Sequence, residues 1–392
     1  MGTENRQLNR KKVVGLVLCV VLVVILAGFI QTLLASASSS GSDKATLTPI
    51  PGHQSGAAAL TATAKAVPSV EPTKVRMAAA TPNAASTANP AATSTAASTT
   101  QPPVTGGSPL LFGTNLTLQD SSDQVLTSAG TRSLMQQMHI KLIRIPTRSN
   151  LSDSTVLQAA QVAQSLGAVP MIILQGDQAD NTALQDDTSI IQGMNKIFGN
   201  STVYYEYGNE EDLTLKLTAQ EYTASWNKVI PQLKKVALNG HFVGPVTYQY
   251  DSGYLQYFLQ NAKPLPTEVS WHEYACASNW TNDICMSHID NWTNHFASAR
   301  GIMNATIGTT LPIMITEWNY TANPTSGDGK SDNDAFMTAW TTKALQNLSA
   351  NGIFAAAQFS CTDYTIPLVD SNGNLTAQGQ TFQKEYAAMV GG

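Results

Sequence analysis

Hydrophobic and polar residues follow three different patterns along the chain. Residues 13–35 are almost entirely apolar, and residues 36–108 are dominated by Ala, Ser, Thr and Pro. From residue 109 to residue 392, short β-rich segments alternate with segments whose apolar residues recur at helical spacing. The pattern therefore predicts an apolar segment, a linker and one folded domain at 109–392.

The alternation within residues 109–392 predicts an α/β domain. The β-rich segments are 109–115, 140–146, 168–174, 202–208, 241–247, 268–274, 312–318 and 353–360. Between two of them, Thr218 and Glu221 form a capping box that opens a helix. Strands that alternate with helices in this number favour parallel βα units closed into a (β/α)8 TIM barrel. A doubly wound open sheet is the alternative, but the first segment lacks the Gly-rich phosphate loop of that fold.

The apolar segment 13–35 is long enough to cross a bilayer core of about 30 Å as a helix. A cluster of Arg and Lys precedes it within residues 1–12, and no comparable cluster follows. The positive-inside rule then keeps residues 1–12 in the cytoplasm and places the C-terminal domain outside the cell membrane. The Ala-Ser-Ala sequence at 35–37 leaves a cleaved signal peptide as the alternative, which would give a secreted domain. Both interpretations predict export.

Residues 36–108 predict a disordered linker between the membrane and the domain. Their composition offers too little apolar surface to offset the entropy of an ordered chain. The whole chain carries a net charge of -5 at pH 7, which argues against a nucleic acid as partner. We expect a monomer.

Three cysteines lie within the predicted domain. Cys276 and Cys285 flank a loop that follows the segment 268–274, and in an exported domain we expect them to form a disulfide. Cys361, which follows the last predicted strand, is an alternative partner for either of them.

Polar and aromatic side chains stand at the ends of the predicted strands, where a (β/α)8 barrel has its active site. These residues are Arg144, Asn209, Glu210, His272, Tyr274, Glu317, Trp318 and Gln358. Two glutamates at one mouth suit glycoside cleavage with retention, which needs a proton donor and a nucleophile about 5–5.5 Å apart. Pairing with a nearby cation or phenol would keep Glu317 ionised. Aromatic neighbours and another carboxylate would keep Glu210 protonated.

Several of these positions have a structural alternative. Arg144 either contacts the substrate or is buried as the partner of Glu206, because a buried charge requires pairing. Strand parity places Trp271 between the strand and a helix. Trp318 and Trp280 are expected in loop-facing positions, where their rings would stack on sugars.

The sequence YYEYGNEE at 204–211 and the sequence PIMITEWNY at 312–320 resemble the paired signatures of clan A glycoside hydrolases. The segments LIRIP, FVGPVTY and SWHEY fall on the second, fifth and sixth predicted strands, as in that clan, so the resemblance covers residues 109–392. The chain departs from the usual pattern at Glu211, where many members have Pro, and at Phe359, where many have Trp.

The resemblance implies a retaining (β/α)8 enzyme with Glu210 as acid/base and Glu317 as nucleophile. It also implies that Asn209 binds the sugar hydroxyl next to the reacting carbon. By the same likeness, Tyr274 or His272 would contact the nucleophile or the sugar.

These features predict an exported, membrane-tethered glycoside hydrolase that cleaves O-glycosidic bonds by double displacement. The expected partners are a polysaccharide or glycoconjugate substrate and the lipid bilayer, through residues 13–35. We expect no cofactor and no metal, because the histidines show no ligand spacing such as HExxH. A non-catalytic carbohydrate-binding barrel, acting as a cell-surface adhesion or sensor module, is the alternative. An inverting hydrolase, with more widely spaced carboxylates, is a third possibility.

Overall fold

The computed structural model describes residues 107–148, 150–176, 182–362, 364 and 366–391. The predicted tail 1–12, the apolar segment 13–35 and all of the linker 36–108 except its last two residues lie outside this part of the chain. Among the described residues, no helix has both the length and the apolar character needed to span a membrane.

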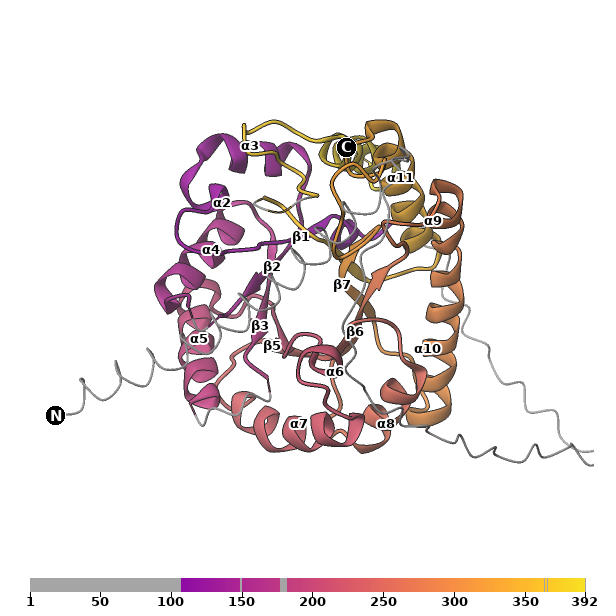
Figure 1. The fold of residues 1–392 in the computed structure, drawn as a ribbon. Coiled ribbons are helices and arrows are strands. Elements are labelled where there is room, and N and C mark those ends of the chain that lie inside the picture. The colour runs from indigo at the N-terminus through magenta and orange to yellow at the C-terminus, as the bar shows by residue number, and fades with distance from the viewer. Residues whose placement is uncertain (1–106, 149, 177–181, 363, 365, 392) are drawn as a thin grey trace, which may run out of the picture. The chain divides into compact units, whose positions relative to one another are not determined.

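Parallel strands form a closed barrel of eight, in chain order around the ring (Figure 1). The strands are β1 (Gly113–Asn115), β2 (Leu142–Pro146), β3 (Val169–Leu174), β4 (Val203–Tyr207), β5 (Gly240–Thr247), β6 (Glu268–Tyr274), β7 (Ile313–Asn319) and β8 (Ala355–Gln358). The barrel closes because β1 pairs with β8, with Gly113 opposite Ala357. The predicted TIM barrel is confirmed, and the doubly wound sheet is excluded.

Helices surround the strands, as Figure 1 shows. They are η1 (Pro109–Leu111), α2 (Gln124–Thr127), α3 (Ala129–Gln137), α4 (Asp153–Ser165), α5 (Ala183–Phe198), α6 (Glu211–Thr214), α7 (Ala219–Leu233), α8 (Ser252–Asn261), α9 (Asn282–His288), α10 (Asn291–Ile307), α11 (Asp334–Ala350) and α12 (Ala377–Met389). The capping box predicted at Thr218 opens α7, where the Thr218 hydroxyl accepts from the Glu221 N–H at 3.3 Å. The first half of the segment 109–115 forms the 3-10 helix η1 rather than a strand, since Pro109 lies in its first turn.

The inside of the barrel has an apolar floor and a polar upper part. The floor consists of Leu142, Met171, Tyr204, Val243, Met314, Ala355 and Ala357. These residues come from the first or middle positions of their strands, so the floor lies toward the N-terminal ends. Further along β2 and β4, the buried polar side chains of Arg144 and Glu206 replace them, and Asn115 at the end of β1 is also buried and polar. This change from apolar to polar marks the mouth of the barrel as the candidate site.

Candidate active site

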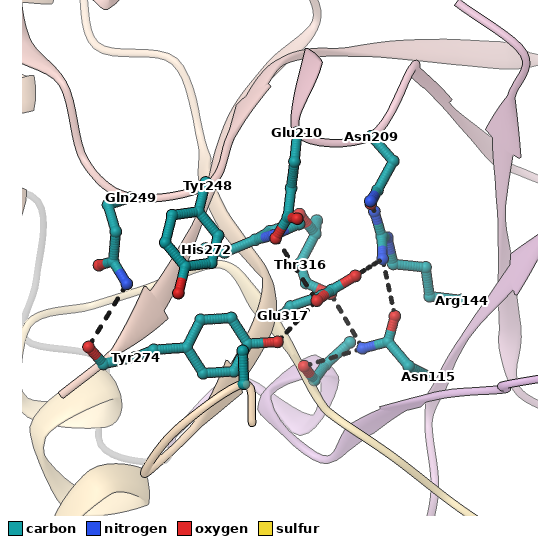
Figure 2. A network of polar contacts seen from close by, with 12 residues as sticks. Asn115, Arg144, Asn209, Glu210, Tyr248, Gln249, His272, Tyr274, Thr316 and Glu317 are labelled. Atoms are coloured by element: carbon teal, nitrogen blue, oxygen red, sulfur yellow. Dashed lines mark hydrogen bonds and ion pairs between the residues drawn. The ribbon is translucent and has the colours of Figure 1, made fainter. Parts of the chain in front are cut away.

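Arg144, in the middle of β2, is the centre of a buried hydrogen-bond network (Figure 2). Its Nε donates to Glu206 Oε2 at 2.5 Å, and Nη2 donates to Asn209 Oδ1 at 2.6 Å. Its Nη1 donates to Glu317 Oε1 at 2.6 Å and to Asn115 Oδ1 at 2.8 Å. Only 1% of the side chain is exposed, so the alternative role as partner of Glu206 holds, and the predicted substrate contact of Arg144 is not supported. The guanidinium instead fixes the groups around it.

Glu317 on β7 lies between several donors at the mouth. The Tyr274 hydroxyl donates to its Oε2 at 2.6 Å, and His272 Nδ1 lies 3.6 Å from the same oxygen. Burial alone would raise the pKa of Glu317, but the charges of His272 and Arg144 and the hydrogen bonds from Tyr274 and Arg144 outweigh it. The pKa of Glu317 therefore lies below its usual value, and the carboxylate is ionised at neutral pH.

Glu210 follows the end of β4 in a left-handed backbone conformation, with φ 53° and ψ 43°. Its N–H donates to the Val246 carbonyl at 3.0 Å, which holds the turn in place. Gly208, two residues earlier, has φ 82°, so the chain bends sharply as it leaves the strand. A non-glycine residue in this region costs about 1–3 kcal/mol and such residues cluster at functional sites. The bend aims the Glu210 carboxylate into the mouth.

His272 on β6 connects the two glutamates. Its Nδ1 and Glu210 Oε1 are 2.7 Å apart, so one proton is shared between these atoms. The ring is fully buried, which lowers its pKa, but the charges of Glu317 and Glu210 and the bond to Glu210 raise the pKa of His272 overall. Its Nε2 is buried without a hydrogen-bond partner among the described residues. The ring therefore serves Glu210 through one nitrogen only.

One carboxylate oxygen of Glu210 and one of Glu317 lie within 4.8 Å of each other, and His272 lies within the same distance of both. Carboxylates and imidazole are also metal ligands. Arg144 is already bonded to Glu317 and would repel a divalent cation, and Tyr274 occupies the second oxygen of that carboxylate. Hydrogen bonds thus account for the geometry of this trio.

The other acidic residues of the run at 210–212 contact the backbone around them. Glu211 is buried. Its Oε1 lies 1.8 Å from the position that a Cβ on Gly176 would take and 2.3 Å from that of a Cβ on Gly208, so only glycine fits at these two positions. Asp212 accepts from the Tyr248 N–H at 3.1 Å. Glu211, at the position where many clan A members have Pro, thus packs on two glycine backbones.

Two further residues at the mouth, Asn115 and Tyr248, were not among the predicted site residues. Asn115 ends β1 and donates from Nδ2 to the Thr316 carbonyl at 3.0 Å while it accepts from Arg144. Tyr248 follows β5, and its ring stacks on Tyr274 with centroids 5.9 Å apart. Burial and the charge of Glu210 raise the pKa of Tyr248, which places it beside the acid/base candidate. Both residues directly end or follow a predicted strand, and this position was the signal that could have found them.

The predictions for Trp318 and Gln358 are wrong. Trp318 is 0% exposed and stacks between Trp340 and Phe382 on the outer side of the barrel. Gln358 is also buried, and its Nε2 donates to Gln378 Oε1 at 2.7 Å and to the Ile366 carbonyl at 3.1 Å. Both side chains pack between a strand and the helix layer, so neither reaches a substrate.

The rim beside β6 carries Trp280 and a disulfide. Trp280 is 38% exposed, and its ring meets His288 edge to face at 4.6 Å, so it remains accessible as a predicted sugar platform. Cys276 and Cys285 form a disulfide that closes this loop, as predicted, so the alternative pairing of either one with the buried Cys361 is excluded. Trp271 packs against Phe296 at 6.0 Å, as strand parity predicted.

Comparison with known proteins supports the fold. No protein-family model matches the chain, and no curated protein matches it. Among solved structures, it is similar to the family 51 α-L-arabinofuranosidase from Bifidobacterium longum, with a TM-score of 0.55 and 14% identity over 73% of this chain and 74% of that one. The family 51 arabinofuranosidase from Xanthomonas axonopodis pv. citri has a TM-score of 0.57 and 13% identity over 73% of this chain and 74% of that one. A monomeric β-xylosidase from Caulobacter crescentus has a TM-score of 0.53 and 12% identity over 72% of this chain and 69% of that one.

These identities show the fold alone. The neighbours are glycosidases, so the predicted resemblance holds at the level of a glycoside hydrolase-like fold. The chemistry of the site depends on its own residues.

Proposed function

We propose that this chain is a retaining glycoside hydrolase that acts on a polysaccharide or glycoconjugate. The observation that carries the proposal is the pair Glu210 and Glu317, whose nearest oxygens lie within 4.8 Å at the mouth of the barrel. Retention needs carboxyl groups about 5–5.5 Å apart, whereas inversion needs about 6.5–9.5 Å to seat a water. The spacing therefore favours retention over inversion.

In the first step, the Glu317 carboxylate attacks the anomeric carbon. Arg144 and Tyr274 keep Glu317 ionised and hold it in one orientation. The proton shared by Glu210 and His272 passes from Glu210 to the glycosidic oxygen as the bond to the leaving group breaks. The product is a covalent ester between Glu317 and the sugar.

In the second step, Glu210 acts as the base. It takes a proton from water, the water oxygen attacks the anomeric carbon, and the ester bond to Glu317 breaks. Two inversions give net retention. A barrel that only binds carbohydrate would not need two carboxylates in such unequal environments, and this favours catalysis over the binding module.

Asn209 is placed to bind the sugar hydroxyl next to the reacting carbon. Arg144 fixes its Oδ1 at 2.6 Å, and its amide nitrogen makes no hydrogen bond to the described residues. Because Oδ1 is fixed, the nitrogen is presented as a donor with little orientational freedom to lose on binding.

The test of the proposed function is a substrate screen with two proteins side by side. Aryl glycosides and plant, fungal and bacterial polysaccharides are incubated with the wild-type protein and with Glu317→Ala, and released sugar is measured. Hydrolysis by the wild-type protein alone would support the proposal. No hydrolysis of any substrate, or equal hydrolysis by both proteins, would contradict it.

The hydrogen bond from Tyr274 to Glu317 predicts a shift in the pH profile. Tyr274→Phe removes a group that lowers the pKa of Glu317, so that pKa should rise. Because Glu317 must be charged to attack, the acidic limb of the kcat/KM profile should move to higher pH. Tyr250→Phe, which loses a bond to Ser298 away from the glutamates, is the matched control. An acidic limb that stays in place in Tyr274→Phe would show that Glu317 does not control it.

We also propose that residues 13–35 anchor the protein in the cell membrane with the barrel outside. The apolar run and the basic residues before it support this orientation. Protease added to intact cells should then release an active fragment that begins within residues 36–108, because linkers of this composition are preferred cleavage sites. N-terminal sequencing of the released fragment measures this. A barrel that stays cell-bound and intact would count against the tether.

A further inference from the structure

An arginine at the mouth of the barrel has no partner for its charge among the residues that the structure describes. Arg148 lies in the loop after β2, two residues beyond Pro146, and is half-buried. Its guanidinium makes no hydrogen bond or ion pair with any residue that the structure describes. Arg144, four residues earlier, has hydrogen bonds to four side chains. The two arginines therefore differ: Arg144 uses four of its five N–H donors, and the guanidinium of Arg148 uses none on the described residues.

The guanidinium of Arg148 interacts electrostatically with residues of the candidate active site. Burial lowers the pKa of Arg148, and the charges of Glu317 and Arg144 also act on it, in opposite directions. The guanidinium is thus within electrostatic range of the proposed nucleophile. Partial burial of a cation without a partner costs free energy. Charge-assisted hydrogen bonds to a bound anion would offset this cost.

A cavity of about 400 Å³ lies beside the loop that carries this arginine. Thr147, the neighbour of Arg148, lines it, and so do Gln175 and Asn209. Asn209 is the residue proposed to bind the reacting sugar, so the cavity borders the reaction centre at Asn209 and the loop of Arg148 at Thr147. Its volume falls within the range of small-ligand pockets. A sugar in this cavity would bring its substituents close to the guanidinium.

We propose that Arg148 binds an anionic group of the substrate, a carboxylate or a sulfate, so that the enzyme selects acidic sugars. This rests on the proposed glycosidase function. The reason is charge balance. Glu210 and Glu317 lie at the mouth and Glu211 lines the cavity, so the site is acidic and repels an acidic sugar unless a cation compensates. The planar fork of arginine matches the two oxygens of a carboxylate or sulfate.

A competing role for Arg148 is purely electrostatic, as a second cation that stabilises the charge of Glu317. That role predicts equal effects on acidic and neutral substrates, since both require the nucleophile. Selection of acidic sugars predicts that the substitution changes the ratio of kcat/KM for an acidic substrate to kcat/KM for its neutral match. This ratio is therefore the quantity to measure.

The test uses polysaccharides in matched acidic and neutral forms. Pectate, alginate, hyaluronan and glucuronoxylan are compared with their carboxyl-reduced forms, and chondroitin sulfate with its desulfated form. We expect the wild-type protein to cleave at least one acidic form faster than its neutral match. Arg148→Gln should lower the ratio of kcat/KM for that pair by about ten- to a hundred-fold, mainly through KM. Arg148→Lys, which keeps the charge but not the fork, should fall in between.

The control is Lys235→Gln, which removes one positive charge from the turn between α7 and β5, at the opposite end of the barrel. Its ratio should equal that of the wild-type protein. Which matched pair responds distinguishes carboxylate from sulfate. A wild-type preference for neutral forms, or an equal change in both forms with Arg148→Gln, would overturn the proposal.

A binding measurement separates this proposal from the proposed function. Affinity electrophoresis through gels that contain each acidic polysaccharide is run with Glu317→Gln and with the double variant Glu317→Gln/Arg148→Gln. Retardation that the second substitution abolishes supports the anion site even if no polysaccharide is hydrolysed. Equal migration of both variants in every gel contradicts it even if hydrolysis is found.

Discussion

Alanine in place of Glu317 should lower kcat on every glycoside that the wild-type protein cleaves by a factor on the order of 10⁵ or more. Without the carboxylate, no covalent intermediate forms at the anomeric carbon. The loss should be as large for a good leaving group as for a poor one, because both need the same attack. Initial rates on a series of aryl glycosides with different phenols measure this.

Azide should partly restore turnover of Glu317→Ala. It fits the space that the carboxylate leaves and attacks from the same face, so the glycosyl azide should have inverted anomeric configuration by NMR. Asp334→Ala, which removes an exposed carboxylate at the start of α11, is the control and should keep the wild-type rate. The variant should still fold, because Arg144 keeps its bonds to Glu206 and Asn115. Residual wild-type activity in Glu317→Ala would place the nucleophile elsewhere.

Local sequence rules predicted the strands and helix starts around the site, and the faces on which some of its side chains lie. The segment 268–274 coincides with β6, and strand parity put His272 and Tyr274 on one face, where both now lie beside Glu317. Helix starts followed from side-chain caps such as that of Thr218 on α7. These features depend on neighbours within a few residues, so the sequence contains enough information to predict them.

The outward direction of Trp318 depends on the register of the barrel. Pairing between β7 and β8 shifts between Ile315 and Trp318, so a count of residues from the inward-facing Met314 no longer tells which side chain of β7 faces inward. Gln358 follows the inward-facing Ala357, and alternation along β8 directs it outward. The partners of Trp318, on α11 and α12, are also distant in sequence. Neither the shift nor these helix contacts can be read from a strand by itself.

The roles of Arg144 and Asn115 could not be predicted for a related reason. Asn115 acts through its bond to Arg144, which in turn orients Asn209 and Glu317 from two other strands. A network of this kind exists only after the barrel closes. The sequence left two alternatives for Arg144, contact with the substrate or burial as the partner of Glu206. The contacts that distinguish them form only when the barrel is closed.

Alanine in place of Glu210 should separate the two steps of the proposed reaction. On substrates with a poor leaving group, kcat/KM should fall by about 10²–10⁴-fold, because no group protonates the glycosidic oxygen. A dinitrophenyl glycoside needs no proton, so its first step should survive. The second step lacks a base and should slow, so dinitrophenol should appear in a burst followed by a slow steady rate. Stopped-flow absorbance measures the burst, and Glu317→Ala, which cannot form the ester, should show none.

Azide distinguishes Glu210→Ala from Glu317→Ala by the stereochemistry of the product. In Glu210→Ala the ester to Glu317 still forms, and azide, which needs no base, attacks it from the side where water would attack. The glycosyl azide should therefore have retained configuration, opposite to that from Glu317→Ala. The alanine removes the partner of His272 Nδ1, 2.7 Å away, so thermal melting of the variant must first show a folded protein. An equal loss of rate on good and poor leaving groups, without a burst and without azide rescue, would mean that Glu210 is not the acid/base and that another carboxyl group donates the proton.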